Sequence, residues 1–567
     1  MNQPTPAIVA QSAVRRLPRL ALLLFCAAYV LPGFIGREPW KSADIAAFGY
    51  MADLAQGVSA WLNPTLLGQR PDIDALLPYW LGAWAIQVSP AWVAPDFAAR
   101  VPFGILLALT LVATWYGTYY LSRSPQAQPV AFAFGGEAAP ADYARAMADG
   151  GLLALIACLG LAQLSHETTP AQAQLCFTAL AFYGAAATPW RTVAPAIGLV
   201  TGLLGLSLSG APAMGLLFGL GSAAICAAGW QRGNQGDAQQ ERSRQIRWAA
   251  AIVLVCVAAA ALAWALGLWR WRIALPHADS REWRSLARLL LWFTWPAWPL
   301  ALWTLWRWRR QLGSRHVALP LWFAAVATAT TITTQSSDRS LLLGLPAFAA
   351  LAAFALPTLK RSVAALVDWF TLLFFSGCAF IIWVIWIAMQ TGFPRQPAAN
   401  VAKLAPGFVP SFSLVAFGIA LAATLAWAWL VKWRAGRNRA AIWKSLVLPA
   451  GGAALSWLLL MTLWMPLLDY ARSYKAQVGS LVARMDRPGC AQVHGLSHPQ
   501  IAALEFHGGL ALRYAGTVAA CPWLVVDADA LDSLNSAVNM KNWQLHASIR
   551  RMNDENDDLL LFRREPR

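Results

Sequence analysis

Long apolar runs alternate with short polar loops over most of the chain. Runs of about 18 or more apolar residues recur between Leu20 and Pro466, and each is long enough to cross a bilayer. Lipid cannot satisfy backbone N–H and C=O groups, so such runs must be helices or the strands of a closed barrel. Barrel strands alternate polar and apolar residues, and these runs do not. The pattern therefore predicts an all-α polytopic membrane protein.

Fourteen runs qualify as candidate spans, and the basic loops between them indicate that one does not cross. Cytoplasmic loops carry an excess of Lys and Arg, and the strongly basic loops agree with a cytoplasmic N-terminus only if the number of spans is odd. The run at 77–94 is the weakest, because Pro78 and Pro90 interrupt it, and we expect an interfacial helix there. The candidates are 18–36, 77–94, 99–121, 150–165, 171–187, 192–209, 212–230, 248–268, 289–306, 317–333, 340–358, 365–388, 411–431 and 445–466.

We therefore expect about 13 transmembrane helices in residues 1–466, with a first periplasmic loop at 37–98. Residues 467–567 lose the long apolar runs and show short strand-like stretches, which predicts a small C-terminal α/β domain in the periplasm. The N-terminus is expected in the cytoplasm of a bacterium, and the protein in its inner membrane. The loop at 269–288 conflicts with this orientation, because it is rich in arginine yet is predicted to be external.

Composition supports this assignment and excludes nucleic acid as a partner. Hydrophobic residues make up 58% of the 567 residues and charged residues only 13%, against about a quarter in soluble domains. The net charge of +17 could suggest nucleic-acid binding, but the basic residues lie in short loops between apolar runs. Membrane lipids are therefore the expected surroundings.

The first outer loop and the outer arginines hold the candidate chemistry. The loop starts with Gly36-Arg37-Glu38-Pro39-Trp40-Lys41-Ser42-Ala43-Asp44 and continues to Leu77-Pro78-Tyr79-Trp80-Leu81. Asp338-Arg339-Ser340-Leu341-Leu342, with Pro346, begins a later span, and Arg281 to Trp298 forms an external amphipathic stretch that leads into a Trp/Pro-rich helix. A P-loop, a GxGxxG, a HExxH and a CxxC pair are absent from the sequence.

These stretches, in this order, resemble the membrane C-type (GT-C) glycosyltransferases related to protein O-mannosyltransferases and to the aminoarabinose transferase of lipid A. The resemblance implies transfer of a sugar from a polyprenyl-phosphate donor to an acceptor (protein, lipid or glycan) at the periplasmic face. Two departures stand out. The family's acidic doublet is reduced to Asp44, and its basic residue before the Tyr-Trp stretch is replaced by Asp72 and Asp74.

The chemistry of such a transfer assigns roles to these residues. A carboxylate can accept the proton of the attacking hydroxyl, which suits Asp44 as the catalytic base. Guanidinium groups can stabilise the departing phosphate, which suits Arg281, Arg284 and Arg339. Further possible site residues are Arg37, Lys41, His166 and Glu167. The sequence indicates no metal ligands or certain cofactor, and leaves a divalent metal open.

Other interpretations of these residues remain open. Asp44 could be an ordinary loop acid or a helix N-cap, Arg339 could snorkel at a helix end, and the arginines at 281–288 could bind anionic headgroups. His166-Glu167 could cap a span at the interface. The protein could also be a transporter or flippase of lipid-linked intermediates, or a structural assembly protein without catalysis, and the sugar and acceptor are not identified.

Cys490 and Cys521 both lie in the C-terminal domain, at the starts of strand-like stretches. Neighbouring parallel strands could bring them within disulfide reach, and a domain in the periplasm would lie in an oxidising compartment. We therefore expect a disulfide, with two separate buried thiols as the alternative.

Overall fold

The chain forms two compact units in the computed structural model, which describes residues 5–228, 235–269, 280–334, 338–435, 441–486, 489–516, 521–551 and 557–564. The first, here the helical unit, comprises Met1–Gly33, Phe103–Ala379 and Ile419–Leu459. The second, here the mixed unit, comprises Phe34–Pro102, Phe380–Gly418 and Leu460–Arg567. This grouping differs from the expected split at residue 466, because the first outer loop belongs with the C-terminal domain.

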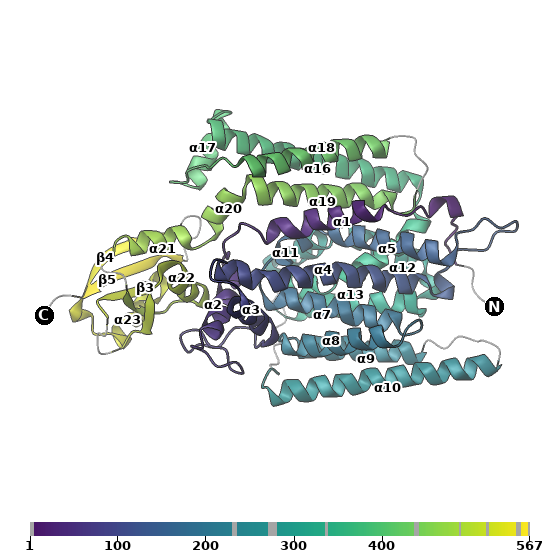
Figure 1. Ribbon diagram of the computed structural model, residues 1–567, viewed down its shortest axis with the longest axis horizontal. Coiled ribbons are helices and arrows are strands. Elements are labelled where there is room, and N and C mark those ends of the chain that lie inside the picture. The colour runs from purple at the N-terminus through teal and green to yellow at the C-terminus, as the bar shows by residue number, and fades with distance from the viewer. Residues whose placement is uncertain are drawn as a thin grey trace. The chain divides into compact units, whose positions relative to one another are not determined.

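The helical unit is built from apolar helices that pack closely through small residues. A Cβ added to Gly202 on α8 would lie 2.7 Å from the Phe177 carbonyl oxygen on α7, so the two helix backbones nearly touch there. Helices α7 to α10 lie side by side (Figure 1). The unit contains, wholly or in part, α1 (Arg19–Val30), α4 (Pro95–Ser122), α5 (Pro140–Ala157), α6 (Leu161–Leu164), α7 (Pro170–Ala187), α8 (Val193–Leu208), α9 (Pro212–Ala228), α10 (Gln235–Ala265), α11 (Ser280–Phe293), α12 (Ala297–Arg307), α13 (Arg315–Thr333), α14 (Asp338–Leu342), α15 (Leu345–Ala355), α16 (Arg361–Thr391), α18 (Leu414–Ala435) and α19 (Lys444–Leu463).

The protein is a mostly helical, multi-span membrane protein. Within the described residues, 6 helices are long and apolar enough to cross a bilayer, and four shorter apolar helices accompany them. The expected span at 289–306 is not one helix, because α11 ends at Phe293 and α12 begins at Ala297, with Pro296 between them. The weak run at 77–94 forms only the 12-residue α3 (Leu77–Val88). The total of about thirteen spans stays a prediction.

The mixed unit contains a five-stranded sheet in the order β2-β1-β3-β5-β4. Strand β1 runs parallel to β2 and β3, while β5 runs antiparallel to β3 and β4. The strands are β1 (Cys490–His494), β2 (Ala511–Tyr514), β3 (Trp523–Asp527), β4 (Trp543–Ile549) and β5 (Leu559–Arg564). The helices are α2 (Ala43–Ala55), α3, α17 (Arg395–Leu404), α20 (Met465–Arg472), α21 (Lys475–Val482), α22 (His498–Gly508) and α23 (Leu531–Ala537).

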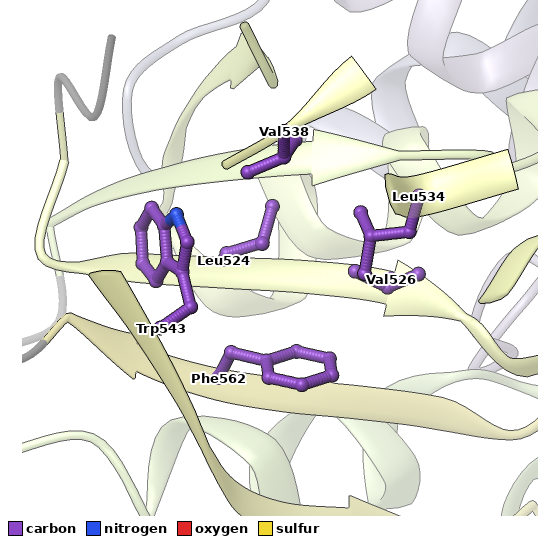
Figure 2. Close-up of a cluster of buried hydrophobic side chains, with 6 residues drawn as sticks. All are labelled: Leu524, Val526, Leu534, Val538, Trp543 and Phe562. Atoms are coloured by element: carbon purple, nitrogen blue, oxygen red, sulfur yellow. The ribbon is translucent and has the colours of Figure 1, made fainter. Parts of the chain in front are cut away.

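The expected C-terminal α/β domain has its own apolar core. All five residues of the central strand β3 are buried, because the strand is covered on both faces. Figure 2 shows side chains from β3, α23, β4 and β5 converging on one face of the sheet. The core residues drawn there are Leu524, Val526, Leu534, Val538, Trp543 and Phe562.

Helix α2 of the first outer loop packs directly on α22 of the C-terminal domain. The rings of Phe48 and Phe506 meet edge to face with centroids 4.6 Å apart. A Cβ added to Gly49 would lie 2.6 Å from the Cβ of Ala502, so glycine permits the close approach of the two helices. This contact fixes the start of α2, where Asp44 lies, against the C-terminal domain.

Cys490 and Cys521 are joined by a disulfide, with their Cα atoms 5.4 Å apart. Cys490 is the first residue of β1, and Cys521 lies two positions before β3 begins, so the bridge links the leading ends of neighbouring parallel strands. The other six cysteines are free thiols.

Candidate functional site

Asp44 is a buried carboxylate in the first turn of α2, where a negative charge interacts favourably with the helix dipole. Its Oδ2 accepts a hydrogen bond from Arg37 Nη2 at 2.8 Å and another from the backbone N–H of Trp40 at 3.1 Å. The side chains of Arg37 and Asp44 are 0% and 1% exposed. Asp44 is not the helix cap, since Ser42 occupies that position. The carboxylate is instead half of a buried ion pair.

Trp40 contacts both this ion pair and further charged groups of the mixed unit. Its ring lies against two guanidinium groups, at 4.6 Å from Arg37 and 5.2 Å from Arg472, in cation–π geometry. Its indole Nε1 donates a 2.6 Å hydrogen bond to Asp469, which also accepts from the backbone N–H of Glu38. Burial raises the pKa of Asp469 to about 6, and the hydrogen bond from Trp40 opposes this rise. The segment before Asp44 is thus fixed by α20.

Arg100 and Asp469 add charges near this ion pair that were not predicted from the sequence. Arg100 is buried and pairs with Asp96 at 2.9 Å, and its electrostatic neighbours include Arg37 and Asp44. Arg100 lies inside the expected span 99–121, and a charge within a membrane span indicates a functional or paired position. That signal was available in the sequence. Asp469 gave no comparable signal, because a lone acid after the last span is ordinary.

Lys41 contacts the carboxylate of Asp557, next to the last strand of the sheet. Asp557 also accepts hydrogen bonds from Arg551 Nη1 at 3.0 Å and from the hydroxyl of Tyr474 at 3.3 Å. Arg37 and Lys41 are two of the further possible site residues, and the structure gives each of them a carboxylate partner within the mixed unit.

A separate cluster in the helical unit contains Arg339, Glu167 and His166. Arg339 on α14 approaches the Glu167 carboxylate at 3.5 Å, and Glu167 also accepts a 3.2 Å hydrogen bond from Gln163 Nε2. The imidazole of His166 is fully buried, with its ring 4.6 Å from the Trp457 ring and its Nε2 3.1 Å from the Tyr29 carbonyl oxygen. His166 therefore has the surroundings of a packed core residue.

Arg281 and Arg284 lie on the exposed side of α11, while Leu286 of the same helix is buried. Helix α11 contacts α14, which carries Arg339. The structure thus places the three predicted phosphate-binding arginines on two neighbouring helices. Arg270 and Arg272 of the same arginine-rich loop lie outside the described residues. Among the residues that are described, no three His, Cys, Asp or Glu side chains gather in a way that could hold a metal ion.

Comparison with solved structures identifies the fold. The chain superimposes on ArnT from Cupriavidus metallidurans bound to undecaprenyl phosphate with a TM-score of 0.60, covering 96% of this chain and 98% of ArnT. The apo state of the same protein gives the same values. The chain has the ArnT fold. The two sequences are only 13% identical, so this likeness concerns the fold.

ArnT is a C-type lipid A aminoarabinose transferase, so the resemblance predicted from the loop motifs is confirmed for the fold. No family model matches the chain. A stretch of 109 residues is 27% identical to human thiamine transporter 1. That match covers 18% of this chain and 22% of the transporter, so the chain spans about a fifth of the relative's length.

Proposed function

We propose that this protein transfers a sugar from a polyprenyl-phosphate donor to an acceptor at the periplasmic face of a bacterial inner membrane. The observation that carries the proposal is the ArnT fold, which extends over 96% of the chain. ArnT itself was crystallised bound to undecaprenyl phosphate, which is a lipid of the proposed donor class. The acceptor is a hydroxyl of a protein, lipid or glycan.

In this reaction a bond forms between the acceptor oxygen and the anomeric carbon while the bond from that carbon to the phosphate oxygen breaks. The lipid phosphate leaves with the electron pair of the broken bond, and the acceptor's proton must go to a base. Asp44 is our candidate base, because a positioned carboxylate can take that proton. Its hydrogen bonds from Arg37 and Trp40 both end on Oδ2, which fixes the direction of the carboxylate.

The leaving phosphate gains negative charge, and cations that face it lower the barrier. Arg281, Arg284 and Arg339 are our candidates for this role. Arg281 and Arg284 are exposed on α11, and Arg339 is one-third exposed beside Glu167, so a guanidinium could turn from the carboxylate to a phosphate. Arginine suits this role because its planar fork matches phosphate oxygens. Glu167 is proposed only as a support of Arg339, and His166 is given no part in the reaction.

Binding of undecaprenyl phosphate to the purified protein tests the donor class. We expect the wild-type protein to bind undecaprenyl phosphate and to bind the neutral undecaprenol far more weakly. The variants Arg281→Ala, Arg284→Ala and Arg339→Ala should each weaken binding of the phosphate lipid by about 10- to 100-fold, since a charge-assisted hydrogen bond contributes roughly 1.5–3 kcal/mol. Arg309→Ala, an exposed arginine of the helical unit in a loop expected to be cytoplasmic, serves as the control.

Equal binding of the two lipids by the wild-type protein would overturn a polyprenyl-phosphate donor. Unchanged affinity in all three variants would place the phosphate elsewhere. The transporter alternative has one observation in its favour, the short match to a thiamine transporter. It predicts movement of a labelled polyprenyl lipid across proteoliposomes without formation of a glycosylated product.

A further inference from the structure

The C-terminal sheet has an edge of the kind at which α/β proteins bind ligands. The chain passes from β1 to β2 on one side, then to β3 on the other side of β1, with all three strands parallel. Open α/β sheets bind ligands outside the carboxyl ends of their strands, at the point where the strand order reverses. That point lies here between the ends of β1 and β3, at His494 and Asp527.

A chain of polar contacts fills this edge. Asp527 accepts a 2.7 Å hydrogen bond from Gln500 Nε2, in the first turn of α22. The same Nε2 lies 3.4 Å from Oδ1 of Asp557, and both acids are largely buried. Asp557 in turn contacts the ammonium group of Lys41. The contacts therefore lead from the ligand-binding edge of the sheet to the first outer loop.

Lys41 is also held through its backbone. Its N–H donates a 2.9 Å hydrogen bond to the carbonyl oxygen of Arg472, and Arg551 Nη2 donates to the same oxygen at 3.1 Å. Arg551 also donates a hydrogen bond to Asp557. Its guanidinium therefore joins the two groups that bind Lys41, the carbonyl oxygen of Arg472 and the carboxylate of Asp557. Lys41 precedes Asp44 by three positions, so the position of Lys41 bears directly on that of Asp44.

We propose that the C-terminal domain binds the Phe34–Ser42 segment at the sheet edge where related sheets bind a ligand. Lys41 and Asp557 are then positioning residues for Asp44. The domain then sets the geometry of the base rather than binding a substrate at this edge. This inference rests on the proposed function for its link to turnover, but the positioning itself can be measured without turnover. It assigns Lys41 to the protein's own carboxylate and not to the donor phosphate.

The test compares Asp557→Asn, Lys41→Met and their double variant with the wild-type protein. We expect each single variant to lower kcat by about 10- to 100-fold, because a displacement of about 1 Å can cost a hundredfold in rate. The KM for the donor should stay within about threefold. The double variant should be no worse than the poorer single variant, and Lys41→Arg should retain most of kcat because a guanidinium can still pair with Asp557.

Hydrogen exchange gives a second measurement that needs no substrate. Backbone amides of residues 36–48 should exchange faster in Asp557→Asn and Lys41→Met than in the wild-type protein. Asp486→Asn is the matched control, because it removes an equal charge from an exposed pair with Arg563 in the same domain. If Asp557→Asn does not yield folded protein, the test uses Lys41→Met alone. This variant should fold, because the Lys41 side chain is 31% exposed and its removal leaves no buried cation without a partner.

The inference is overturned if exchange in residues 36–48 is unchanged in both variants, or if Lys41→Met raises the donor KM while Asp557→Asn does not. The second result would make Lys41 a phosphate ligand. If the wild-type protein transfers no sugar, the proposed function fails. Faster exchange in the two variants, with none in the control, would still support the positioning of the segment by the C-terminal domain.

Discussion

Removing one partner of the buried pair of Arg37 and Asp44 should cost the protein much of its stability. Both side chains are almost completely buried, so neutralising one leaves the other charge without its partner. We consider Arg37→Met, Asp44→Asn and the double variant, which removes both charges with little change of shape. Such a cycle measures the interaction between the two residues rather than the sum of their contacts.

The magnitude follows from the surroundings. Breaking a buried ion pair by removing one partner typically costs about 3–5 kcal/mol. Asp469 also interacts electrostatically with Arg37, so Asp44→Asn should fall near the lower end of this range. A cost of about 3 kcal/mol changes the unfolding equilibrium roughly a hundredfold, since 1.4 kcal/mol corresponds to a factor of ten. The double variant should cost clearly less than the two single variants together, because no lone charge stays buried.

Thermal unfolding in detergent, followed by tryptophan fluorescence, is the assay. Unfolding of a membrane protein this large is often irreversible, so apparent melting temperatures are compared at one heating rate. Both single variants should melt clearly below the wild-type protein, and the double variant should recover part of the loss. Additive losses in the double variant, or single variants that melt like the wild type, would refute the coupling. The result also bears on activity assays, since loss of turnover in Asp44→Asn alone would not separate catalysis from folding.

Three further predictions concern other parts of the molecule. Thiol-reactive mass tags should modify neither Cys490 nor Cys521 in unreduced, denatured protein, and labelling of both before reduction would exclude the bridge. Reduction of the disulfide should destabilise the domain by about 3–4 kcal/mol in the chain-entropy model. Burial, with a smaller effect from the charge of Asp53, raises the pKa of Glu505 from 4.5 to about 7. The folded state therefore holds this proton more tightly than the unfolded state, and the stability it contributes below about pH 4.5 is lost as the pH rises through 7. The melting temperature of Glu505→Gln minus that of the wild-type protein should therefore increase between pH 5 and pH 8. A difference that does not vary with pH would contradict this. Finally, an impermeant thiol reagent should label a cysteine at residue 484 from the periplasm and leave one at residue 125 unlabelled, whereas the opposite pattern would reverse the predicted topology.

The membrane helices were predictable because lipid imposes a simple rule on the sequence. A run of apolar residues of sufficient length must be helical, whatever its neighbours are. The division of 289–306 between α11 and α12 was harder to predict, because proline is tolerated within membrane helices as well as between them. Asp44 drew attention because it stands at the acidic position of the resembled family's first outer loop, where a carboxylate can serve as a base.

The partners of Asp44 and its neighbours were less predictable. Arg37 lies seven positions from Asp44 and could be guessed, but Trp40 and Asp469 are 429 positions apart, and Lys41 and Asp557 are 516 apart. Pairs so distant in sequence are brought together by the packing of α2 on α22, which no local pattern encodes. The C-terminal domain was therefore recognisable as an α/β domain, while its contacts with the first outer loop needed the structure.

Sugar transfer by the purified, reconstituted protein is the most direct test of the proposed function. The protein is incubated with a panel of polyprenyl-phosphate sugars and with periplasmic acceptors, and mass spectrometry follows both the glycosylated product and the released polyprenyl phosphate. We predict that at least one donor gives the two products in equal amounts. Asp44→Asn should abolish both products even at temperatures well below its apparent melting point, while Asp486→Asn should leave them unchanged. Release of neither product from any donor by folded wild-type protein, or full turnover by Asp44→Asn, would contradict the account.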